Sequence, residues 1–145
     1  MTKTDFNLDT FLPYQFNVAA GRLSRQFARR YRERFGISVA EWRVVAHLSQ
    51  SGTVSVREIH ERVDMDKSKV SRAAARLEAA GYLTKFRSES DKRLVDLTLT
   101  EKGRAMMVEL AEVANAYQAE VLSQLGTDAA ALQRQLSRLT QTGEG

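Results

Sequence analysis

The sequence predicts a mainly α-helical protein with one small β-hairpin, and three observations support this fold class. Apolar residues recur every three or four positions over most of the chain, as in amphipathic helices. Serine followed three positions later by glutamate precedes two of these segments, which is typical of helix N-termini. Between residues 82 and 99, β-branched and aromatic residues and alternating polarity indicate strands instead. With 145 residues and 43% hydrophobic content, the chain suits one domain or one protomer of an intertwined dimer.

The first helix is expected to begin near Pro13, because the fixed φ angle of proline suits a first helical turn. Gly36 can end this helix in a left-handed conformation. Its apolar face comprises Phe16, Ala20, Leu23, Phe27 and Tyr31.

Two further helices are expected to begin at capping boxes. Residues 38–41 read Ser-Val-Ala-Glu and residues 55–58 read Ser-Val-Arg-Glu, so each segment offers a hydroxyl and a carboxylate to free N–H groups. The first box opens a helix that ends near Gly52, and the second opens a short helix to about Val63. The next helix spans about 66–80, with Asp66 as its cap and Gly81 after its end.

Two strands, 82–87 and 94–99, are expected to form a hairpin whose polar tip is residues 88–93. Thr100 can cap a long helix that Gly126 ends, and Asp128 can cap a last helix. These observations predict an N-terminal helix at 1–36, a central domain at 37–100 and C-terminal helices at 101–145. Apolar residues line one side of the two C-terminal helices: Met107, Leu110, Ala114, Tyr117 and Val121, then Ala129, Leu132, Leu136 and Leu139.

The helices at 55–63 and 66–80 fit a helix-turn-helix. The second has an apolar side at Val70, Ala74 and Leu77. Its opposite side carries Ser68, Lys69, Ser71, Arg72 and Arg76. A helix fits the major groove of DNA, where small hydroxyls allow close approach and basic side chains reach guanine edges or phosphates. Asp66 near the helix start would repel phosphate unless a capping bond occupies it.

The same pattern also suits an ordinary solvated helix face. The hairpin favours DNA binding, because a long basic-tipped hairpin has no evident role in a core and can place one arginine in the narrow minor groove. Together these elements predict a winged helix-turn-helix fold.

Positive charge is concentrated in the N-terminal and central parts of the chain, although the net charge is only +4. Residues 22–34 hold six arginines and one acid, whereas the stretch after residue 104 is mildly acidic. Along one face of the first helix lie Arg22, Arg25, Arg29 and Arg32. This face can meet the DNA flank, pair with acids of a partner chain, or be simply solvated, and all three interpretations stay open.

Several functional classes find no support in the sequence. The chain has no cysteine, which excludes disulfides, thiolate metal sites and cysteine-based sensing. His60 to Asp64 begins like a zinc-binding helix but has aspartate where the second histidine belongs, so we expect no metal and no cofactor. No nucleotide-binding loop or catalytic triad is visible, so an enzyme is not expected. No apolar run approaches the roughly 20 residues of a membrane span, and no signal peptide is visible, so a cytoplasmic protein without membrane association is expected.

The chain resembles the multiple antibiotic resistance regulators, the MarR family. Residues 66–72 read Asp-Lys-Ser-Lys-Val-Ser-Arg, and residues 76–83 read Arg-Leu-Glu-Ala-Ala-Gly-Tyr-Leu. The family pattern has D-x-R in the wing and L-T-x-x-G at a set distance after it. Asp91 and Arg93 match the first element, and Leu99, Thr100 and Gly103 match the second. With the order of helices, the resemblance covers nearly the whole chain.

The resemblance implies which residues bind duplex DNA. It places the recognition helix in the major groove, with base or phosphate contacts from Lys67, Ser68, Lys69 and Arg72. It places Arg93 in the minor groove, and it implies that Asp91 orients that arginine. A simple turn-forming role for Asp91 remains equally open.

The resemblance also implies a homodimer, interlocked by the N- and C-terminal helices, that represses transcription from a pseudo-palindromic operator. Packing of these helices within one chain is the alternative. A small-molecule effector pocket is implied where the dimer helices meet the winged domain. Tyr14, Trp42, His47, Met106 and Met107 can approach that junction, but ordinary core packing also explains Trp42 and the methionines, so no effector-binding residue is named. The alternative function is a winged-helix protein-interaction module without DNA affinity.

Overall fold

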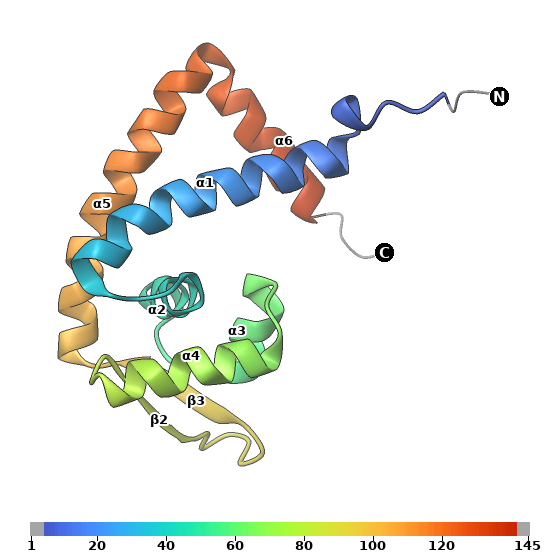
Figure 1. The fold of residues 1–145 in the computed structure, drawn as a ribbon. Coiled ribbons are helices and arrows are strands. Elements are labelled where there is room, and N and C mark those ends of the chain that lie inside the picture. Colours follow the sequence, from blue (N-terminus) through green and yellow to red (C-terminus); the bar gives the residue numbers. More distant parts are fainter. Residues whose placement is uncertain (1–4, 142–145) are drawn as a thin grey trace. The chain divides into compact units, whose positions relative to one another are not determined.

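The computed structural model describes residues 5–141 of the chain (Figure 1). It is mainly α-helical with one small sheet, which confirms the predicted fold class. The chain divides into two compact units, residues 1–110 and 111–145, and the first holds the sheet and the candidate site. The elements are η1 (Leu8–Thr10), α1 (Leu12–Phe35), α2 (Val39–Ser51), β1 (Val54–Ser55), α3 (Val56–Val63), α4 (Lys67–Ala79), β2 (Leu83–Arg87), β3 (Val95–Leu99), α5 (Glu101–Leu125), η2 (Gly126–Asp128) and α6 (Ala129–Gln141).

Local signals in the sequence set most helix ends. Pro13 lies in the first turn of α1, and Gly36 ends that helix with φ 68°. The capping box of α2 is complete, because the Ser38 hydroxyl accepts from the Glu41 N–H at 3.2 Å and the Glu41 carboxylate accepts from the Ser38 N–H at 3.3 Å. Thr100 caps α5 by accepting a hydrogen bond from the Gly103 N–H at 3.0 Å.

Two predicted caps differ from the structure. The Ser55 hydroxyl accepts from the Glu58 N–H as expected, but the Glu58 carboxylate lies 3.5 Å from the Arg62 guanidinium instead of returning a capping bond. Asp66 is the N-cap residue of α4, yet its side chain makes no capping hydrogen bond. The Asp66 carboxylate therefore accepts no hydrogen bond from the first N–H groups of α4.

The sheet has three strands in the order β1-β3-β2, all antiparallel. The predicted hairpin is β2 and β3, with Leu83 opposite Leu99 and Arg87 opposite Val95. The sequence analysis missed β1, whose two residues are too short to show alternation. Val54 of β1 lies opposite Leu97 of β3, so the short strand attaches the hairpin to the start of α3.

The core of the first unit lies between the helices and the sheet. Its fully buried side chains include Val44, Val45 and Leu48 of α2, Ile59 of α3, Val70 and Leu77 of α4, Leu83 and Leu97 of the sheet, and Leu110 of α5. In α1, Tyr31 is buried, and its ring stacks on Trp42 with centroids 5.8 Å apart. Met106 is buried, and Trp42 and Met107 pack against the core, which agrees with ordinary core packing of all three.

The second unit comprises the end of α5, η2 and α6. Ala129 and Leu132 are half-buried, whereas Leu136 and Leu139 are 39% and 55% exposed.

Among residues 5–141, no helix combines the length and the apolar character needed to cross a membrane.

Candidate nucleic-acid interface

Helix α4 presents an exposed basic face and a buried apolar face. Val70, Ala73, Ala74 and Leu77 are at most 2% exposed and pack into the core. All six residues that the sequence predicts as contacts on this helix are exposed: Lys67, Ser68, Lys69, Ser71, Arg72 and Arg76. The apolar face therefore fixes the helix, while the hydroxyl and basic side chains are free to meet a ligand.

The α3–α4 turn that positions α4 depends on two residues with roles that sequence reasoning did not assign. Asp64 has φ 55°, an unusual conformation for a residue other than glycine. The His60 ring forms a hydrogen bond with the Met65 carbonyl, which ties the end of α3 to the turn. The Nδ1 atom of His60 is therefore engaged in the fold, and no group of three metal-ligating residues occurs within residues 5–141.

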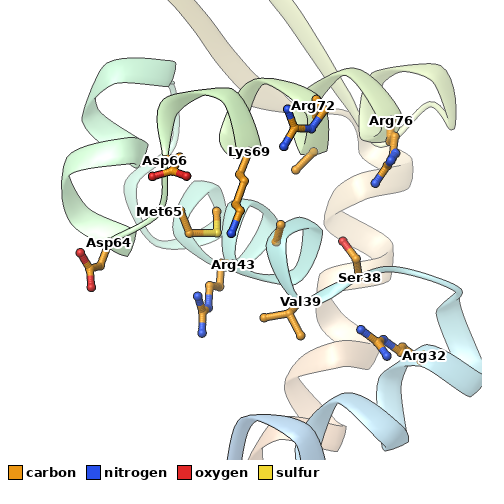
Figure 2. Close-up of a pocket in the computed structure, with 12 residues that line it drawn as sticks. Arg32, Ser38, Val39, Arg43, Asp64, Met65, Asp66, Lys69, Arg72 and Arg76 are labelled. Carbon is orange, nitrogen blue, oxygen red and sulfur yellow. The ribbon is translucent and has the colours of Figure 1, made fainter. Parts of the chain in front are cut away.

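The predicted contacts divide between the two flanks of α4. Lys67 and Ser71 face the wing and, with Lys85 and Arg93, line a groove of about 360 Å³. Lys69, Arg72 and Arg76 line a separate hollow of about 470 Å³ on the side of α2 (Figure 2). A helical wheel predicts that all these residues are exposed, but it does not show which neighbouring element each one faces.

The wing holds Arg93 in a defined position. The Arg93 Nε and Nη2 atoms donate to the two Asp91 carboxylate oxygens at 3.0 Å each, and the Arg93 backbone N–H donates to the same carboxylate at 3.1 Å. The side chain of Arg93 is nevertheless 87% exposed. These hydrogen bonds hold the pKa of Asp91 below its usual value and raise the pKa of Arg93. Asp91 is thus placed to orient an arginine that stays available for a ligand.

Ser88 stabilises the tip of the wing and was missed by the sequence analysis. It is 4% exposed, and its hydroxyl accepts from the Asp91 N–H at 3.3 Å. Its backbone N–H donates to the Leu94 carbonyl at 3.0 Å. These bonds close the turn that carries Asp91 and Arg93. A serine within a polar tip gives no sequence signal for such burial.

Arg76 differs from the other predicted contacts on α4 because its guanidinium forms an ion pair with an acid. Its guanidinium lies 3.8 Å from the Glu41 carboxylate, whose side chain is only 10% exposed. Glu41 also completes the capping box of α2. Arg76 therefore connects the recognition helix to the start of α2 in addition to facing solvent.

Comparison with known proteins agrees with this geometry. The model of the MarR family matches residues 35–94. The HTH-type transcriptional repressor MdtR of Bacillus subtilis is 31% identical over 116 residues, covering 77% of this chain and 75% of the relative. The HTH-type transcriptional regulator SarZ of Staphylococcus aureus is 24% identical over 102 residues, covering 70% and 68% of the two chains.

Solved structures show the same fold. A MarR/EmrR family transcriptional regulator from Acinetobacter sp. ADP1 superposes with a TM-score of 0.84 at 28% identity, covering 94% of this chain and 97% of that one. NadR in complex with 4-hydroxyphenylacetate gives a TM-score of 0.80 at 22% identity, covering 99% of each chain. The basic recognition helix, the arginine at the wing tip and these similarities agree: the chain is a DNA-binding transcriptional regulator that belongs to the MarR family.

Proposed function

We propose that the protein represses transcription as a homodimer on a pseudo-palindromic operator. In this proposal α4 enters the major groove through Lys67, Ser68, Lys69, Ser71, Arg72 and Arg76, and Arg93 enters the adjacent minor groove. The observation that carries the proposal is the pairing of an exposed basic helix with an exposed wing arginine that Asp91 holds in place. Repression is supported by MdtR, which is named a repressor.

Exposed apolar side chains at both ends of the chain support the homodimer. Phe6, Leu8, Phe11 and Leu12 are between 46% and 59% exposed, and Leu139 on α6 is 55% exposed. Exposed large apolar residues that recur along terminal elements are typical of protein interfaces. We therefore assign residues 1–36 and 101–145 to dimerisation and residues 37–100 to DNA binding. Two recognition helices in a dimer read half-sites about one helical turn apart.

A small-molecule effector that releases the DNA is part of the proposal. NadR, which shares the fold, was solved with 4-hydroxyphenylacetate. A regulator of this kind acts where the chromosome lies, which in bacteria is the cytoplasm. The proposed activity is binding, not catalysis.

Selection of bound fragments from a random DNA pool tests the proposal. We expect enrichment of a two-fold symmetric sequence, and sedimentation should give the mass of a dimer. With the selected DNA, Arg93→Ala should weaken binding at least about fivefold. Arg134→Ala removes the same charge from an exposed position on α6; with its dimer mass verified by sedimentation, it should change the affinity less than about twofold. If no sequence is enriched, a protein-interaction role is favoured over DNA binding; if Arg93→Ala binds like wild type, the minor-groove role of the wing is wrong.

A further inference from the structure

The wing groove, which lies between α4 and the β2–β3 hairpin, is lined by positive charge from four different elements (Figure 1). Its volume is about 360 Å³. The cations are Arg57 of α3, Lys67 of α4, Lys85 of β2 and Arg93 of the wing tip. Apart from Ser71, the remaining lining is apolar, and within residues 5–141 no acid lines the groove. The lining therefore suits an anionic partner.

The sheet register explains why Lys85 reaches this groove. Lys85 lies directly opposite Leu97, and residues in such pairs share one face of a sheet. Since Leu97 is fully buried, Lys85 extends from the face that packs against the helices. Its ammonium lies 3.4 Å from the Glu78 carboxylate near the end of α4, and the two side chains are 34% and 42% exposed. An ion pair this exposed adds little stability, so Lys85 can exchange Glu78 for another anion at small cost.

Arg57 brings an unpaired charge to the same groove. It is the second residue of α3 and is exposed. Within residues 5–141, its side chain forms no hydrogen bond or ion pair. Hydrogen bonds from Arg93 lower the pKa of Asp91 most, and the charge of Arg57 lowers it further, which places Arg57 near the wing tip. The two Asp91 oxygens are already bonded to Arg93, so the Arg57 donors stay available.

The geometry of duplex DNA identifies the partner of these charges. One sugar–phosphate strand separates each major groove from the adjacent minor groove. If α4 occupies a major groove and Arg93 the next minor groove, that strand must pass between them, over the wing groove. Each strand carries one negative charge per about 3.4 Å of helix axis, and an acid-free basic lining complements such a strand.

We propose that the wing groove holds the backbone of one DNA strand, that Arg57 and Lys85 bind its phosphates, and that Lys85 leaves Glu78 to do so. The proposal rests on the proposed function, in which α4 and Arg93 occupy neighbouring DNA grooves. Glu78 competes with DNA for Lys85 and so lowers the affinity for every sequence alike. Phosphate contacts position a protein without reading bases, so Arg57 and Lys85 set affinity and leave the preferred sequence unchanged.

The salt dependence of binding to the selected DNA tests the phosphate contacts. Arg57→Gln and Lys85→Gln should each reduce the slope of log affinity against log salt by about 0.9 for each protomer, which is about 1.8 for the proposed dimer. Arg57→Lys keeps the charge and should keep the wild-type slope. The matched control Arg25→Gln removes one charge from an exposed position on α1 outside the groove. With its dimer mass verified by sedimentation, this control should also keep the wild-type slope.

Glu78→Gln separates a DNA contact of Lys85 from a purely structural role. If Glu78 competes with DNA, this variant should bind DNA about two- to fivefold more tightly than wild type. The gain should disappear in the Lys85→Gln background, because the competition then has no object. If Lys85 acts only through its ion pair with Glu78, then Glu78→Gln and Lys85→Gln should weaken binding equally.

The outcomes distinguish this proposal from the proposed function. An unchanged salt slope in Arg57→Gln or Lys85→Gln, or no gain of affinity in Glu78→Gln, would overturn the strand path while leaving operator binding by α4 intact. Selection from the random pool by Arg57→Gln and Lys85→Gln should return the wild-type sequence, and a changed sequence would show base contacts in place of phosphate contacts. If the wild type itself enriches no sequence, the proposed function fails first, and this proposal fails with it.

Discussion

Gly103 is the position where one added methyl group should cause the largest local damage. It is buried in the first turn of α5, against the beginning of the hairpin. A Cβ atom at this position would lie 2.0 Å from the Tyr82 carbonyl oxygen, 3.0 Å from its carbonyl carbon and 3.1 Å from Leu99 Cδ2. Ordinary contacts of a Cβ atom are 3.4–4 Å, so Gly103→Ala forces backbone, not only side chains, to move.

The loss of stability follows from two hydrogen bonds that join Tyr82, Thr100 and Gly103. The Tyr82 carbonyl accepts a hydrogen bond from the Thr100 N–H at 3.0 Å, and the Thr100 hydroxyl accepts from the Gly103 N–H at 3.0 Å. Moving α5 away from Tyr82 weakens both bonds, at about 0.5–1.5 kcal/mol each. Overpacking of a rigid site adds about 1–3 kcal/mol. We expect Gly103→Ala to lower the free energy of unfolding by at least about 2 kcal/mol.

Urea unfolding followed by circular dichroism, at one fixed protein concentration, measures this change. Gly21→Ala is the matched control, because Gly21 is also helical and its added Cβ would meet only the flexible Arg25 guanidinium, at 3.1 Å. Alanine is favoured over glycine in a helix by about 1 kcal/mol, so this variant should be as stable as wild type or more so. A Gly103→Ala variant within about 1 kcal/mol of wild type would refute the reasoning.

Three further predictions concern caps, pH and salt. Ser38→Ala should lower the free energy of unfolding by about 1 kcal/mol in urea titrations, because it removes a capping bond. Asp66→Ala loses no capping bond and should lower the free energy of unfolding by less than about 0.5 kcal/mol. Equal losses of stability in the two variants would contradict the observed caps. Burial and then the charge of Arg62 lower the pKa of His47 in the folded state, so the neutral ring contributes stability that is present above its usual value of 6.5 and lost as pH falls. Stability should therefore decline less between about pH 7 and about pH 5 in His47→Gln than in wild type, and parallel declines would exclude this contribution. Lys67→Gln should reduce the slope of log affinity against log salt for the selected DNA by about 0.9 for each protomer, which is about 1.8 for the proposed dimer, and an unchanged slope would remove Lys67 from the phosphate contacts.

The sequence predicted most of the fold because its signals are local. A hydroxyl three residues before a glutamate, a proline in a first turn and a glycine after a helix each act through bonds to near neighbours. This is why the helix bounds at Gly36, Ser38 and Thr100 are confirmed. Strand β1 escaped detection because its pairing with β3 is set by residues more than forty positions away, not by its own pattern.

Competition between partners explains why Glu58 does not complete its capping box. Glu58 has both the Ser55 N–H and the Arg62 guanidinium within reach along one short helix, and the structure places its carboxylate by Arg62. The side chain of Asp66 leaves the first N–H groups of α4 without a side-chain bond. Local sequence shows which partners are available, but the chosen partner depends on the folded surroundings.

The candidate site was predictable as a face but not as two flanks. Helical periodicity is enough to separate the exposed Arg72 from the buried Val70. It gives no information on what packs beside the helix, because Arg32 and Arg43 reach the α2 flank from other parts of the chain. The hollow therefore appears only in three dimensions.

Hydrogen bonds connect the C-terminal end of the recognition helix α4 to the first turn of α5, which belongs to the segment that we propose for dimerisation. The Thr100 hydroxyl donates to the Gly81 carbonyl, and the Lys102 ammonium donates to the Ala80 carbonyl, each at 2.6 Å. The Lys102 charge thus lies at the C-terminal end of α4, where the helix dipole favours a cation. With the close packing of Gly103 on Tyr82, these bonds attach the first turn of α5 to the end of the recognition helix. In the proposed dimer, a displacement of that turn would act directly on α4 through these bonds.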